Sequence, residues 1–171
     1  MMKHKKEIKI SSYEVEQRLF TYSYYVGEAR RNGGVPLKLA AGIQASSDDH
    51  VQMNDHINVA TGELVKILNN NFGACRLHSL NDDGHEGYLI FMFCLTPPQY
   101  FPGGLFAELQ NTMTHFLVMR TLQQWMMQHK PDEAAITAVE MEKATIQLRE
   151  LMNTRVTPRR IKRRTRNNIE F

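Results

Sequence analysis

The sequence has little cysteine and no long apolar run. Cys75 and Cys94 form no CxxC motif and have no histidine at a metal-ligand spacing, which argues against structural zinc and for a reducing compartment. No apolar run approaches the roughly 18 to 20 residues of a membrane-spanning helix. The opening MMKHKKEIKI lacks the apolar segment and cleavage site of a signal peptide. We therefore expect no membrane partner and no export.

The familiar catalytic motifs are also missing. The sequence has no glycine-rich phosphate loop, no GxSxG, no HExxH and no kinase signature. Its densest polar cluster holds Asp48, Asp49, His50, Asp55 and His56. On a helix the two histidines of this cluster fall on different sides, so an acidic helix start explains it better than a metal site does. We expect no enzymatic activity, no cofactor and no metal.

Charge is concentrated at the two ends of the chain. The whole sequence has 21 Lys and Arg against 18 Asp and Glu, a net charge of +3. Residues 1–9 hold four Lys and one Glu, and residues 155–171 hold seven basic groups and one Glu, which leaves 10 basic and 16 acidic residues between them. Blocks of like charge are usually solvated extensions. The sequence therefore predicts an acidic body, residues 11–154, with basic arms at 1–10 and 155–171.

The first half of the body shows two helical patterns. Ser11 and Glu14 have the spacing of a capping box, and Gly33 follows the segment that they open. A long connection over 33–47 precedes a second helix that runs from about 48 to 73. The apolar faces predicted for the two helices are Val15, Leu19, Tyr22, Val26 and Ala29 in the first, and Met53, Ile57, Ala60, Leu64 and Ile67 in the second.

A β-hairpin is predicted over about 74–95. The runs ACRLHSL and GYLIFMFCL flank the turn-rich NDDGHE, and the second run is apolar enough to be buried on both sides. This turn resembles a calcium loop only in its first residues and lacks the distant Glu. A hairpin that is symmetric about Gly84 and His85 brings Cys75 opposite Cys94, which leaves a disulfide and two free thiols both open. The reducing compartment argues against the disulfide.

Two long helices are predicted after the break TPPQYFPGG. The first spans about 105–129 and carries a wide apolar stripe that includes Trp125. Pro131 suits the first position of the second helix, and the short HKPD link favours antiparallel packing. The fold class is therefore mainly α: a helical bundle with a C-terminal antiparallel helical hairpin, one small β-hairpin and basic terminal arms.

This order of elements resembles the head-to-tail connector proteins, also called neck or adaptor proteins, of tailed bacteriophages. The stretches that carry the resemblance are LIFMFCL, FAELQNTMTHFLVMRTLQQWMMQ, PDEAAITAVEMEKATIQLRELMN and TPRRIKRRTRNNIEF, about half of the chain. The aromatic first helix and the 33–47 connection have no clear counterpart in that pattern. The resemblance concerns architecture, and it includes no strict motif.

The resemblance implies a virion structural subunit, made in the bacterial host cytoplasm and located in the neck. Such subunits form homo-oligomeric rings, commonly dodecamers, which join the portal to the tail or to neighbouring connector proteins around a channel for double-stranded DNA. The expected contact residues lie in the C-terminal arm: Arg155, Arg159, Arg160, Lys162, Arg163, Arg164, Arg166 and Phe171.

The alternative is a nucleic-acid-binding protein whose Arg-rich arm grips phosphates. The six Arg and one Lys of the arm suit bidentate pairing with either carboxylates or phosphates. The acidic body argues against a duplex lying across it, and the sequence shows no helix-turn-helix or zinc finger.

Overall fold

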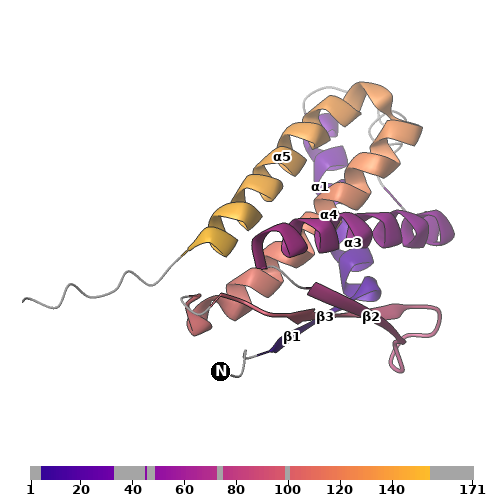
Figure 1. Cartoon of the computed structure of the whole chain (residues 1–171). Coiled ribbons are helices and arrows are strands. Elements are labelled where there is room, and N and C mark those ends of the chain that lie inside the picture. Colours follow the sequence, from indigo (N-terminus) through magenta and orange to yellow (C-terminus); the bar gives the residue numbers. More distant parts are fainter. Residues whose placement is uncertain (1–4, 33–44, 46–48, 73–74, 99–100, 155–171) are drawn as a thin grey trace, which may run out of the picture.

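The computed structural model describes residues 5–32, 45, 49–72, 75–98 and 101–154. This part of the chain is mainly helical, with four α-helices and a small three-stranded antiparallel sheet (Figure 1). The prediction of a mainly helical fold with a small sheet is confirmed, but the sheet has one strand more than predicted. The elements in chain order are β1 (Lys6–Ser11), α1 (Ser12–Asn32), α3 (His50–Phe72), β2 (Cys75–Asn81), β3 (Leu89–Leu95), the 3-10 turn η2 (Gly103–Leu105), α4 (Phe106–His129) and α5 (Pro131–Asn153).

Strand β1 corrects the prediction that residues 1–10 form a basic arm. It pairs antiparallel with β3 and buries Ile8 and Ile10, while Lys9 between them is exposed. This alternation is the period of two that a half-buried strand requires. The lysines around it suit an edge strand, because exposed charges discourage pairing with further chains. Residues 1–4 lie outside the described part of the chain.

The predicted hairpin is present as β2 and β3, and β3 is the central strand of the order β1-β3-β2. Phe91, Phe93 and Leu95 on β3 are buried against the helices, whereas its other face is only half-buried. β3 is thus less completely buried than the sequence suggested.

The register of the hairpin separates the two cysteines. Cys75 pairs with Leu95, and Cys94 pairs with Arg76, one residue away from the symmetric pairing that was considered. A shift of one residue places the two side chains on opposite faces of the sheet. Both thiols are free, and burial raises the pKa of Cys75 to about 11, which keeps this thiol protonated.

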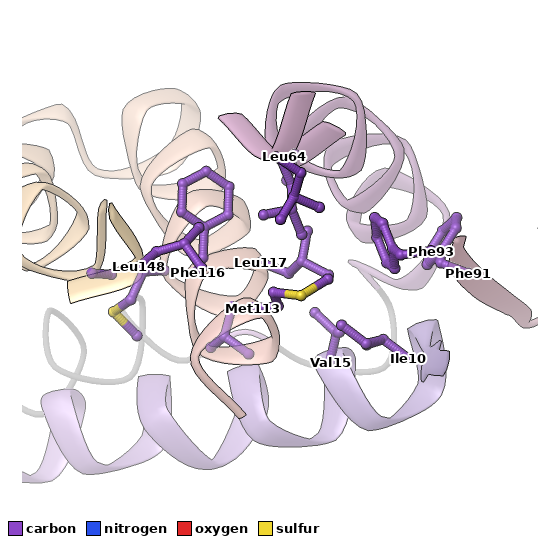
Figure 2. Close-up of a cluster of buried hydrophobic side chains, with 14 of the residues drawn as sticks. Ile10, Val15, Leu64, Phe91, Phe93, Met113, Phe116, Leu117 and Leu148 are labelled. Carbon is purple, nitrogen blue, oxygen red and sulfur yellow. The ribbon is translucent and has the colours of Figure 1, made fainter. Parts of the chain in front are cut away.

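Helix α4 lies at the centre of the fold and is buried around most of its circumference. It packs against α5, α3, α1 and β1. Figure 2 shows Met113, Phe116 and Leu117 of α4 among side chains from the other elements. The fully buried α4 side chains include Leu109, Met113, Phe116, Leu117, Leu122 and Met126. The wide apolar stripe predicted for this segment is confirmed.

The other helices bury one face each. Val15 and Leu19 of α1 are buried as predicted, and so are Met53, Ile57, Ala60 and Leu64 of α3. α5 begins at Pro131, as the sequence indicated, and buries Thr137, Ala144, Leu148 and Met152. Only Lys130 separates α4 from α5, and the two helices pack against each other. None of the helices in the described ranges is long and apolar enough to cross a membrane.

Trp125 near the end of α4 is 3% exposed and stacks on His129, with ring centroids 4.8 Å apart. Replacing Trp125 with Ala should lower the free energy of unfolding by about 3 to 5 kcal/mol, because it removes a large buried side chain and leaves a cavity. Urea unfolding followed by circular dichroism measures this change. Met127→Ala is the matched control, because Met127 is 59% exposed on the same turn and should change stability by less than about 0.5 kcal/mol. Equal midpoints for the two variants would contradict the assignment.

Candidate functional site

The contact residues predicted in the C-terminal arm lie outside the described part of the chain. These are Arg155, Arg159, Arg160, Lys162, Arg163, Arg164, Arg166 and Phe171. The described chain ends at Thr154, whose extended backbone (φ −61°, ψ 131°) terminates α5. The predicted arm therefore starts one residue after the cap of a long helix.

A buried carboxylate, which sequence reasoning missed, joins three separate segments of the fold. Glu16 on α1 is only 1% exposed. His50, the first residue of α3, lies with Nδ1 2.8 Å from Oε1 of Glu16. The hydroxyl of Tyr88, just before β3, donates to Oε2 of the same carboxylate. A buried carboxylate is costly unless it is hydrogen-bonded, and both of its oxygens have partners here.

The contact made by the second ring nitrogen of His50 determines the tautomer of the ring. The amide nitrogen of Asn54 lies 3.1 Å from Nε2 of His50. An amide nitrogen is a donor, so Nε2 accepts and the proton of the neutral ring is on Nδ1, which donates to Glu16. The ring edge of His50 also contacts Tyr88, with centroids 4.7 Å apart. We call Glu16, His50 and Tyr88 together the Glu16 cluster.

Aromatic stacking extends the Glu16 cluster toward the β2–β3 turn. Tyr13 on α1 stacks on His85 of the turn, with centroids 3.8 Å apart and planes at 14°. The same Tyr13 ring meets Tyr88 edge to face at 5.1 Å. Such aromatic pairs stabilise a fold by about 0.5 to 1.5 kcal/mol in addition to the stabilisation that comes from burying their apolar area. The turn is therefore held on the first turn of α1.

Two serines at the β1–α1 junction complete this attachment. The Oγ of Ser11 accepts from the backbone N–H of Tyr13 at 3.2 Å, which caps α1 as the sequence predicted. Ser11 also donates to Oδ2 of Asp82 at 2.8 Å, and this bond is the main cause that lowers the pKa of Asp82. Ser12 accepts from the backbone N–H of Leu89 at 2.9 Å. Glu14 does not complete a capping box in its side-chain contacts, because it pairs with Arg18 instead.

The Glu16 cluster connects α1, α3 and the segment before β3 through hydrogen bonds. The tyrosine hydroxyl and the imidazole N–H both donate to one carboxylate, so their protons are engaged in holding the structure together. A hollow of about 400 Å³ lies beside Tyr88, with Asp82, Asp83 and Glu86 in its lining. This hollow contains acidic side chains of the turn but no cysteine or histidine.

The polar cluster considered in the sequence as a metal site is divided in the structure. His50 is engaged with Glu16, whereas His56 lies farther along α3 with a buried Nε2, and burial lowers its pKa. Asp48 lies outside the described residues. Within the described ranges, no three His, Cys, Asp or Glu side chains are grouped closely enough to hold a metal ion.

A second unpredicted feature is an apolar stripe on the outer face of α5. Ile136, Val139 and Ile146 are 50%, 52% and 46% exposed, although the opposite face of the helix is buried. Lys143 lies on the same line and pairs with Glu140 at 2.7 Å. We call Ile136, Val139, Lys143 and Ile146 the outer stripe of α5. The helix follows the outer edge of the molecule, away from the sheet (Figure 1).

Comparison of the chain with known proteins found no matching family, no similar curated protein and no similar solved structure.

The Glu16 cluster predicts the effect of removing one hydroxyl. Tyr88→Phe should lower the free energy of unfolding by about 1 to 3 kcal/mol, because an oxygen of a buried carboxylate loses its donor. Tyr25→Phe is the control, since Tyr25 is 66% exposed and should leave stability unchanged. Both variants can be compared by chemical unfolding at neutral pH. A Tyr88→Phe protein as stable as the control would show that the bond to Glu16 contributes nothing.

The dependence of stability on pH in the alkaline range gives an independent check of the hydrogen bond between Tyr88 and Glu16. Burial, followed by the hydrogen bond to Glu16 and the charge of Glu16, raises the pKa of Tyr88 to about 12. The pKa of a tyrosine in the unfolded chain is about 10. The contribution of Tyr88 to stability is therefore complete below that pH and is lost as the pH rises from about 10 to about 12. Burial also raises the pKa of Tyr22, which acts in the same direction. Stability measured from pH 9 upward, in steps of about one unit, should therefore fall less steeply in Tyr88→Phe than in the parent, and parallel curves would contradict the assignment.

Proposed function

We propose that the protein is a structural subunit of a head-to-tail connector ring in a tailed bacteriophage. In this proposal, copies of the chain form a ring, commonly a dodecamer in such assemblies, in the neck of the virion. The ring joins the portal to the tail or to neighbouring connector proteins around the channel for double-stranded DNA. α4 and α5 are the antiparallel helical hairpin of the body, and residues 155–171 are an assembly arm.

The observation that carries the proposal is the presence of exposed apolar side chains on several different helices. Tyr24 and Tyr25 on α1 are 51% and 66% exposed, and Val51 and Val59 on α3 are 75% and 52% exposed. The outer stripe of α5 adds a third set. A subunit in a ring contacts its two neighbours through different surfaces, because the contact is heterologous. Several separate apolar sites suit that requirement better than a single patch does.

The position of the arm supports the same function. α5 is a 23-residue helix, so it extends for roughly 35 Å, and the arm begins at its end. A charged arm that becomes ordered only on assembly loses conformational entropy at that step, and the many contacts that form together offset the loss. Its Arg residues can pair bidentately with carboxylates of a neighbour, and the body, residues 11–154, has an excess of six acidic groups.

Removing residues 155–171 tests the proposal. The shortened chain should keep the circular dichroism spectrum and melting behaviour of the parent but lose the ring mass seen by native mass spectrometry. The buried hydrophobic residues of the described chain lie between Ile8 and Met152, so the deletion removes none of them. A shortened chain that assembles into the same ring would contradict the assembly role of the arm.

A charge-matched variant distinguishes bidentate Arg–carboxylate pairing from nonspecific electrostatic attraction. Changing the six arginines of the arm to lysine keeps every charge but removes the planar bidentate donors. The ring should then dissociate at lower salt than the parent ring does. If both rings show the same salt dependence, the arm contributes net charge rather than specific pairing.

The same proteins distinguish the nucleic-acid-binding alternative. An assembly arm gives weak DNA binding that does not depend on sequence and that is lost at physiological salt. Tight binding of a defined DNA site by the intact chain, together with normal assembly of the shortened chain, would favour the alternative.

A further inference from the structure

The outer stripe of α5 has the spacing of a coiled-coil seam. Ile136, Val139, Lys143 and Ile146 are separated by three, four and three residues, which are the a and d positions of a heptad repeat. All four side chains are exposed, while Ala144 and Leu148 on the opposite face are buried in the body. α5 therefore has two apolar faces, and the body covers only one of them.

We infer that the outer stripe is covered by α5 of a second copy of this chain, running antiparallel. A seam of this kind accepts a helix that presents the same repeat. The other exposed apolar side chains on the described helices lack that spacing: Val51 and Val59 are eight residues apart, Tyr24 and Tyr25 are adjacent, and Met127 stands alone on α4. The stripe of a second copy meets the requirement, because a two-fold contact uses the same surface on both partners.

Charge decides the direction of the second helix. A parallel arrangement in register places Lys143 against Lys143, so two like charges meet inside the seam. An antiparallel arrangement centred on Met141 places Ile136 against Ile146 and Lys143 against Val139 of the partner. Each Lys143 then lies beside Glu140 and Glu142 of the other copy, which are acidic. The 2.7 Å pair between Lys143 and Glu140 within one chain shows that the ammonium group already reaches a glutamate from this position.

This contact is different from the one that repeats around a ring. A two-fold contact closes after two copies, so it predicts a dimer of the free protein. The seam from Ile136 to Ile146 is only about 15 Å long, and a contact of this size should dissociate on dilution. The dimer and the proposed ring can therefore be tested separately.

The first experiment measures the mass of the free, full-length protein by sedimentation velocity over a hundredfold range of concentration. The parent should move from monomer to dimer as concentration rises, and Ile146→Asp should remain monomeric throughout that range. Val59→Asp is the matched control, because it places the same charge at an exposed valine on α3 and should dimerise like the parent. A parent that is monomeric at all concentrations, or an Ile146→Asp protein that still dimerises, would overturn the inference. A parent that forms rings without a dimer would overturn it while leaving the proposed ring intact.

The second experiment reads the direction of the helices. Ile136→Cys and Ile146→Cys are made in separate chains that also carry Cys94→Ala, while Cys75 stays because it is buried and protonated. After mild oxidation, the antiparallel contact should link residue 136 of one chain to residue 146 of the other in a mixture of the two proteins. Neither protein should crosslink efficiently by itself. Efficient crosslinking of the Ile136→Cys protein with itself indicates parallel helices, and an uncrosslinked mixture indicates no contact here; either result rejects the antiparallel dimer.

Discussion

The burial of α4 around most of its circumference is the constraint on which the rest of the fold depends. A helix with so wide an apolar surface must be covered from several sides, and α1, α3, α5 and β1 all pack against it. Figure 2 shows this arrangement, with Leu64 of α3 and Leu148 of α5 approaching α4 side chains from different directions. Each surrounding element then needs only one apolar face. An apolar face beyond that one has no role within the body.

The polar contacts hold together the elements that α4 alone would leave loosely joined. α1, the start of α3 and the β2–β3 turn meet at the Glu16 carboxylate, and Ser11 ties the same turn to the end of β1. A buried charge of this kind stabilises little by comparison with an apolar contact, because its desolvation offsets much of the attraction. Its effect is mainly geometric, since removing one partner leaves the others unsatisfied. This helps to fix where α3 begins relative to α1.

Sequence reasoning succeeded where periodicity is strong and failed where tertiary context decides. Val15, Leu19 and Leu64 were predicted correctly, because a repeat of three and four residues identifies the buried face of a helix. Strand β1 was missed because its two buried isoleucines stand among lysines, and a block of positive charge suggests a solvated arm. Glu16 was missed because its donors lie 34 and 72 residues away, beyond any local pattern. The hairpin was found, but its register depends on turn geometry that differs by one residue from a symmetric guess.

The outer stripe of α5 was also missed, because tertiary context decides which face of a helix is buried. The buried residues of this helix (Thr137, Ala144, Leu148 and Met152) and the outer stripe both follow a helical repeat, so periodicity alone does not tell which face turns inward. The structure assigns the inner face to the series that contains Leu148 and leaves Ile136, Val139 and Ile146 in solvent. Lys143 within the stripe reduces its hydrophobicity and selects among arrangements of a partner helix, as single polar residues do in coiled coils. An apolar face with one charged position is thus suited to a contact that forms and dissociates reversibly.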